Sequence, residues 1–209
     1  NEVKVIEQGN GKTNGHQKYI IKEIKLSNGD MIKIGSLGGG AKMDKTGKNA
    51  INGKGWDDFD FEDYVKSIKD TTAEMKSEHT DLNSIIASIH EGMSGGKEKT
   101  LNLYTKNMTR QCSGNLNDVL KELDNGFIDA VISGDKSELV HDWVNGIPVI
   151  SGLDGGQFTN IVYLPFKKNN GKYELVKDEV KIEGPLPNCE MIFKNTKICD
   201  EVFVEEQYK

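Results

Sequence analysis

The segment between Asp60 and Met93 carries the longest helical pattern of the sequence and constrains the fold more than any other stretch. The positions of its stripe follow one another at alternating steps of four and three, which is the spacing of one face of an α-helix. The stripe consists of Phe61, Val65, Ile68, Thr72, Met75, His79, Leu82, Ile86, Ile89 and Met93. Carboxylates at 57–63 would meet the positive end of the helix dipole, and Gly92, Gly95 and Gly96 would end the helix. The pattern predicts a long amphipathic helix, either continuous or broken near 76–81.

Segments rich in β-forming residues lie on both sides of this predicted helix. The sequence predicts hairpins that pair 18–26 with 31–37, 158–166 with 172–182, and 189–193 with 198–204. An Asn28-Gly29 pair joins the first two runs, and this dipeptide is the strongest short-range signal for a hairpin. Consecutive apolar residues at 161–164 predict a strand that is covered on both faces.

The middle of the chain alternates between strand-like and helix-like segments. Strands are predicted at 100–105, 127–132 and 147–150, and short helices at 116–123 and 137–144. Such alternation is typical of a local βαβαβ layer. Together the patterns predict an α+β fold, in which a long amphipathic helix packs on a mostly antiparallel β-sheet with a short βαβ-like stretch in the middle. We expect one domain over residues 1–209, with a weak boundary at 94–97.

Composition argues against several classes of function. No run approaches the about 20 apolar residues that cross a bilayer. The net charge is −6 and Arg110 is the only arginine, which argues against a clustered basic face for nucleic acid. The loops are rich in Gly, Asn and Lys, and Asn1 stands where a start methionine would be, so an export signal could have preceded it. The leading hypothesis is a non-catalytic bacterial protein, secreted or on the cell surface, that binds a protein partner as a virulence or surface-assembly component.

An alternative hypothesis is an enzyme that uses Cys112 as its nucleophile. Residues 110–114 read Arg-Gln-Cys-Ser-Gly just before a predicted helix, and a helix N-terminus lowers the pKa of a thiol. With His141 as base and Asp154 or Gln157 as orienting group, this thiol would form a cysteine hydrolase or deamidase of a secreted effector or toxin. Cys-Ser-Gly before a helix resembles the nucleophile turn of the NlpC/P60 cysteine peptidases, and His141 would have to serve as their downstream histidine.

A third hypothesis is a small-ligand binding lobe. Residues 120–132 read Leu-Lys-Glu-Leu-Asp-Asn-Gly-Phe-Ile-Asp-Ala-Val-Ile, a helix end, a glycine and an Asp-Ala pair that opens an apolar strand. This run looks like the helix-to-strand unit in the lobes of periplasmic solute-binding proteins. The resemblance implies a ligand-binding cleft.

The sequence gives no cofactor or metal signature. Residues 9–13 have the end of a P-loop, but Ile6 stands where its first glycine belongs. The four histidines share no ligand spacing, and the acidic run at 57–63 lacks the spacing of an EF-hand. Cys189 and Cys199 flank a predicted hairpin and are the candidate disulfide, with two free thiols as the alternative.

Overall fold

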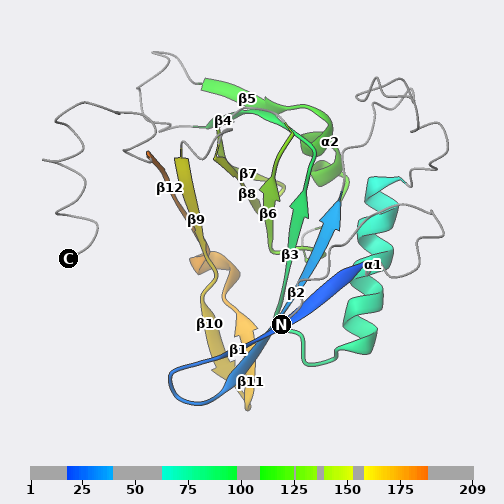
Figure 1. Cartoon of the computed structure of the whole chain (residues 1–209), viewed down its shortest axis with the longest axis vertical. Helices are drawn as coiled ribbons and strands as arrows, with labels where there is room; N and C mark the ends of the chain where they lie inside the picture. Colours follow the sequence, from blue (N-terminus) through cyan, green and yellow to red (C-terminus); the bar gives the residue numbers. More distant parts are fainter. Residues whose placement is uncertain are drawn as a thin grey trace, which may run out of the picture.

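The computed structural model describes residues 18–39, 63–97, 109–124, 126–135, 139–152 and 158–187. Their centre is a six-stranded mixed sheet in the order β1-β2-β3-β6-β8-β7 (Figure 1). Its strands are Tyr19–Lys25 (β1), Met31–Gly39 (β2), Ser84–Ile89 (β3), Ala130–Ser133 (β6), Leu139–Val144 (β7) and Ile147–Gly152 (β8). The pairs β2·β3, β3·β6 and β6·β8 are parallel, whereas β1·β2 and β7·β8 are antiparallel. The sheet therefore has a parallel centre and two antiparallel edges.

Helix α1 (Tyr64–Glu78) connects β2 to β3 and packs on the sheet. It begins after Asp63, whose carboxylate accepts the backbone N–H of Lys66 at 2.9 Å, a cap that typically contributes about 1 kcal/mol. Its buried side chains include Ile68 and Met75, which join Leu37 of β2 in one apolar cluster. Helix α2 (Asn115–Lys121) buries Leu116 and Leu120 in the same cluster.

The approach of α1 to β2 depends on Gly35. A Cβ atom at this position would lie 2.8 Å from the sulfur of Met75 and 3.4 Å from a methyl carbon of Leu82. Real Cβ atoms keep larger distances from their neighbours, so a side chain at Gly35 would push the helix from the sheet or displace Met75. Met75 is fully buried, which leaves it little room to move.

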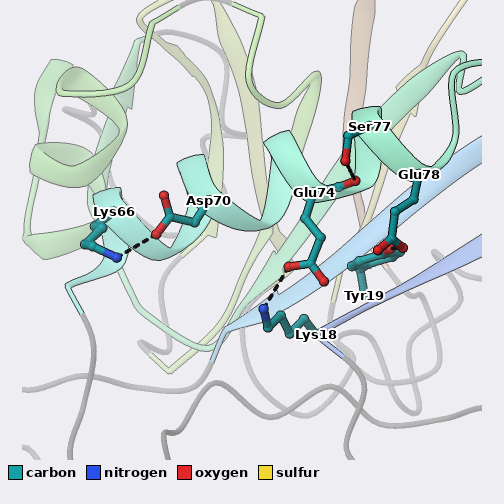
Figure 2. Close-up of polar contacts among 7 residues, drawn as sticks. All are labelled: Lys18, Tyr19, Lys66, Asp70, Glu74, Ser77 and Glu78. Atoms are coloured by element: carbon teal, nitrogen blue, oxygen red, sulfur yellow. Dashed lines mark hydrogen bonds and ion pairs between the residues drawn. The ribbon is translucent and has the colours of Figure 1, made fainter.

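Polar contacts attach the edge strand β1 to α1, as Figure 2 shows. Lys18, just before β1, forms an ion pair of 2.7 Å with Glu74, and the hydroxyl of Tyr19 donates to the carboxylate of Glu78. This hydrogen bond, with smaller contributions from burial and nearby acidic charge, raises the pKa of Tyr19 to about 12.

Three two-stranded sheets complete the described part of the chain. They pair Ser94–Lys97 (β4) with Thr109–Ser113 (β5), Phe158–Tyr163 (β9) with Lys181–Pro187 (β12), and Phe166–Asn169 (β10) with Lys172–Leu175 (β11). A 3-10 helix, Lys177–Glu179 (η1), follows β11. Asp30, in the turn between β1 and β2, accepts hydrogen bonds from Lys168 at 2.6 Å and from the hydroxyl of Tyr173 at 2.8 Å. These bonds hold the β10–β11 hairpin against the main sheet (Figure 1).

The predicted fold class is wrong. The helix expected over 60–93 ends at Glu78, and Ser84–Ile89 forms the central strand β3. The isoleucines at 85, 86 and 89 fit the step of a helix, but this short β-branched run also fits a strand, and parallel pairing on both sides decides for the strand. Helix α1 consequently connects β2 to β3 and covers the parallel centre of the sheet. It does not pack on an antiparallel sheet formed by the end of the chain, as predicted.

Two further local predictions are wrong. The segment expected to form a helix at 137–144 contains β7. The run at 161–164 does not form a central strand, because β9 pairs only with β12 among the described residues and Tyr163 is 46% exposed.

Other local predictions are confirmed. The Asn28-Gly29 hairpin, the short helix near 116 and the strand at 147 are all present, and a turn at 169–172 joins β10 to β11. The strand predicted at 100–105 and the hairpin predicted at 189–204 lie outside the described residues. Residues 94–97 form β4, and the single domain stays a prediction. Within the described ranges, no helix has both the length and the apolar character needed to span a membrane.

We expect the substitution Gly35→Ala to destabilise the fold by about 1–3 kcal/mol, because the added methyl group overpacks the contact with Met75. Urea denaturation followed by circular dichroism measures the free energy of unfolding. Ser36→Ala, one position along on the other face of the strand, is the control and should change stability by less than about 0.5 kcal/mol. In the double variant G35A/M75A the two penalties should be less than additive, and full additivity would contradict the close contact.

Candidate functional site

The carboxyl ends of β2, β3 and β6 lie side by side at one edge of the sheet (Figure 1). Two backbone hydrogen bonds join the residues that follow these strands. The N–H of His90 donates to the carbonyl of Gly39 at 2.7 Å, and the N–H of Gly134 donates to the carbonyl of Ile89 at 3.0 Å. In open α/β sheets, ligands bind at the carboxyl ends of the strands. This edge is therefore the candidate functional site.

His90 and Asp135 bring the reactive groups of this edge together. The Nε2 atom of His90 lies 3.7 Å from the Oδ1 atom of Asp135, and the two side chains are 65% and 38% exposed. A Cβ atom at Gly134 would lie 3.0 Å from the Nδ1 atom of His90, so the glycine leaves room for the imidazole ring. The pair is thus open to a ligand and positioned by the backbone beneath it.

Asp135 adopts a backbone conformation that non-glycine residues rarely take. Its φ angle is 70°, in the left-handed region. Aspartate tolerates this region better than most residues, and such conformations are concentrated at functional sites. The carboxylate of Asp135 consequently faces His90 from a turn that costs backbone energy.

The His90–Asp135 pair can move a proton or contribute ligands to a cation. A histidine imidazole can accept or donate a proton, and a carboxylate beside it can hold the ring in one orientation. Imidazole nitrogen and carboxylate oxygen are also common ligands of divalent cations. Glu91, the next residue in the chain, is only 5% exposed and adds a buried carboxyl group close in sequence to the pair. Within the residues that the structure describes, no group of three His, Cys, Asp or Glu side chains is arranged to hold a metal ion.

The structure gives Cys112 a different environment from the one predicted. Cys112 lies in β5, and its thiol donates to the Oδ2 atom of Asp142 at 3.2 Å. Burial, followed by this hydrogen bond and by the charge of Asp142, raises the pKa of Cys112 to about 12. The nearby start of α2 does not offset these effects. The thiol is therefore held in its protonated form, whereas a nucleophile needs the thiolate.

His141 precedes Asp142 on β7. Neighbouring residues of a strand point to opposite faces, so the imidazole of His141 points away from the face on which Asp142 meets Cys112. Burial lowers the pKa of His141, and the neighbouring Asn160 and the charge of Asp142 oppose this shift. The structure thus places a carboxylate beside Cys112, with the imidazole on the other side of the strand. Asp154, Gln157 and the disulfide candidates Cys189 and Cys199 lie outside the described residues, as does the P-loop-like run at 9–13.

Sequence reasoning missed His90 and Asp135 as a pair. His90 directly follows the apolar run at 84–89, and Asp135 comes two residues after β6. Polar residues that follow buried parallel strands are the signal that could have found them. The signal was hidden because the run at 84–89 was assigned to a helix, which placed His90 on a helix surface.

No protein-family model matches the sequence, and no curated protein matches it. Among solved structures, the chain is similar to the crystal structure of the calcineurin-like phosphoesterase YfkN from Bacillus subtilis. This likeness has a TM-score of 0.56 at 22% identity and covers 86% of this chain and 55% of that chain. The chain is also similar to a crystal structure of a putative 5'-nucleotidase from Staphylococcus aureus in complex with alpha-ketoglutarate. There the TM-score is 0.50 at 13% identity, with 88% of this chain and 33% of that chain covered.

These likenesses establish a shared fold. The chain spans about half the length of YfkN and about a third of the length of the nucleotidase. They also correct the leading functional hypothesis of a non-catalytic surface protein. That hypothesis was inferred from the lack of any enzyme-like feature in the sequence, whereas the similar structures are those of enzymes. The expectations of virulence, secretion and protein binding lose their support for the same reason. The hypothesis of a solute-binding lobe is corrected as well, since the chain is similar in fold to a phosphoesterase and a nucleotidase.

We expect Cys112 to alkylate slowly in the folded protein at neutral pH, because its pKa of about 12 leaves little thiolate. Iodoacetamide labelling across a pH series, with mass spectrometry of the peptide that contains Cys112, measures this pKa. Asp142→Asn should lower the pKa and speed labelling, because the carboxylate that favours the thiol form is gone. A Cys112 pKa below the ordinary value of 9.0 would contradict the described environment.

Proposed function

We propose that this chain is part of a hydrolase that acts on phosphate esters, with its reactive edge at the carboxyl ends of β2, β3 and β6. The observation that carries the proposal is the His90–Asp135 pair at this edge, in a fold similar to that of a calcineurin-like phosphoesterase. Fold likeness alone does not assign chemistry. Here it coincides with an exposed imidazole and carboxylate at the edge where such sheets bind ligands.

His90 has the chemistry to stabilise or protonate an oxygen of a phosphate ester. Its imidazole is 65% exposed and carries its Nε2 atom toward Asp135 at 3.7 Å. In the protonated form, the ring would attract the negative charge of a phosphoryl group, and it could donate a proton to the leaving oxygen. Asp135 would orient the ring, which makes it a positioning residue.

A divalent cation would suit the same edge. His90 and Asp135 offer the nitrogen and oxygen ligands that such an ion takes, and when bound it would polarise a phosphoryl oxygen. The described residues supply these two ligands and no third one close enough to complete a set. We therefore assign no catalytic step to a cation.

We expect the variant His90→Asn to lose phosphate-ester hydrolysis by about 100- to 10,000-fold, the usual contribution of a general acid or base. The assay follows release of p-nitrophenol from p-nitrophenyl phosphate and its diester by the full chain, with and without added manganese. His79→Gln is the matched control, since His79 lies at the other end of the β3 connection, after α1. Equal rates in H90N and H79Q, or no hydrolysis by the unmodified chain, would contradict the proposal.

Substitutions at Asp135 separate the effect of the carboxylate on activity from the effect of the strained backbone on stability. Asp135→Gly removes the carboxylate but suits the φ of 70°, so we expect activity to fall at least about tenfold while the melting temperature does not fall. Asp135→Asn keeps the side-chain shape without the charge and should lose activity to a similar degree. Full activity in either variant would remove Asp135 from the site.

A further inference from the structure

A second cluster of reactive side chains lies beside β7, the last strand of the six-stranded sheet. An open pocket of about 620 Å³ is lined there by Cys112, Asn117, Lys121 and residues 142–145. None of these residues belongs to the His90–Asp135 edge, so the pocket is a separate feature of the fold.

The carboxylate of Asp142 is held in a fixed orientation within this pocket. Its Oδ1 atom accepts the backbone N–H of Trp143 at 2.6 Å, and its Oδ2 atom lies 3.2 Å from the sulfur of Cys112. Asp142 is only 8% exposed. In metal sites, carboxylate ligands are commonly oriented by hydrogen bonds from groups that do not touch the metal. Asp142 resembles such a ligand, because a backbone N–H fixes one of its oxygens while the other faces a thiol.

Asn117 adds an oxygen that has no partner among the described residues. The side chain is 2% exposed, and its Nδ2 atom donates to the carboxylate of Asp118 at 3.2 Å. Its Oδ1 atom is buried and accepts no hydrogen bond from the described part of the chain. Buried polar atoms are nearly always paired, so this oxygen indicates a partner outside the described part of the chain, and a bound ion would supply one.

We propose that Cys112, Asp142 and Asn117 bind a thiophilic divalent cation of the zinc or cadmium type. Thiolate sulfur selects soft and borderline cations, and carboxylate and amide oxygens complete their coordination. Zinc–sulfur and zinc–oxygen bonds of about 2.3 and 2.1 Å at a tetrahedral angle place the two ligand atoms about 3.6 Å apart. The separation of 3.2 Å between Cys112 and Asp142 is close to this value.

Binding replaces one bond by another without oxidation or reduction. The S–H bond of Cys112 breaks, its proton leaves to solvent, and a sulfur–metal bond forms. The cation then neutralises the thiolate and the carboxylate together, while water fills the remaining coordination positions in the open pocket. The positively charged side chain of Lys121 also lines the pocket, and its charge repels the incoming metal ion.

Cadmium titration tests the proposal, because a cadmium–thiolate bond gives a charge-transfer absorbance in the ultraviolet. The full chain with Cys189→Ser and Cys199→Ser leaves Cys112 as the only thiol. In this background we expect the band to saturate at one thiolate-bound cadmium ion per chain, which zinc displaces and excess magnesium does not. Adding Cys112→Ser should remove the band. No band, or displacement by magnesium as readily as by zinc, would overturn the proposal.

Variants of the other groups make the test specific. Asp142→Asn keeps an oxygen for the N–H of Trp143, so the fold should persist while cadmium affinity falls roughly tenfold or more. Asn117→Ala should also weaken binding. His90→Asn, at the other site, should leave the affinity unchanged. Circular dichroism confirms that each variant is folded. If both D142N and N117A bind cadmium with unaltered affinity, the thiol of Cys112 alone holds the ion and the proposal is overturned.

Discussion

The parallel pairing of β3 with β2 on one side and β6 on the other is the constraint on which the rest of the structure depends. Parallel neighbours cannot be joined by a tight turn, so the chain must cross over the sheet between them. Helix α1 makes the crossover from β2 to β3, and its contact with Gly35 brings it close enough to bury Ile68 and Met75. Parallel pairing also places the ends of three strands at one edge, where His90 and Asp135 meet.

Local sequence signals predicted those parts of the fold in which local and tertiary preferences agree. The Asn28-Gly29 turn produces its hairpin because Gly29 adopts the left-handed backbone of the turn, with a φ of 88°, without support from elsewhere. The strand β3 was missed because Ile85, Ile86 and Ile89 satisfy both a helical and an extended pattern, and only partners distant in sequence decide between them. β7 was missed for a related reason, since the buried Asp142 interrupts the apolar alternation of Val140 and Val144.

The candidate site could be predicted less well than the fold. His90 and Asp135 are 45 positions apart in the sequence, and they meet only because β3 and β6 are neighbours in the sheet. Cys112 was correctly placed before a short helix, but nothing in the sequence indicated the burial and the hydrogen bond to Asp142 that raise its pKa. Burial and the carboxylate of Asp142 decide its pKa, and both come from tertiary contacts that the residues around Cys112 do not encode.

The carboxylate of Asp30 joins positions that are 143 residues apart through its bond to Tyr173. Closing so long a segment of free chain is entropically costly unless the intervening strands have already brought the two ends near each other. The β10–β11 hairpin should therefore dock late, onto a sheet that is already assembled. One acidic side chain in the turn between β1 and β2 thus holds in place a hairpin that is synthesised long after it.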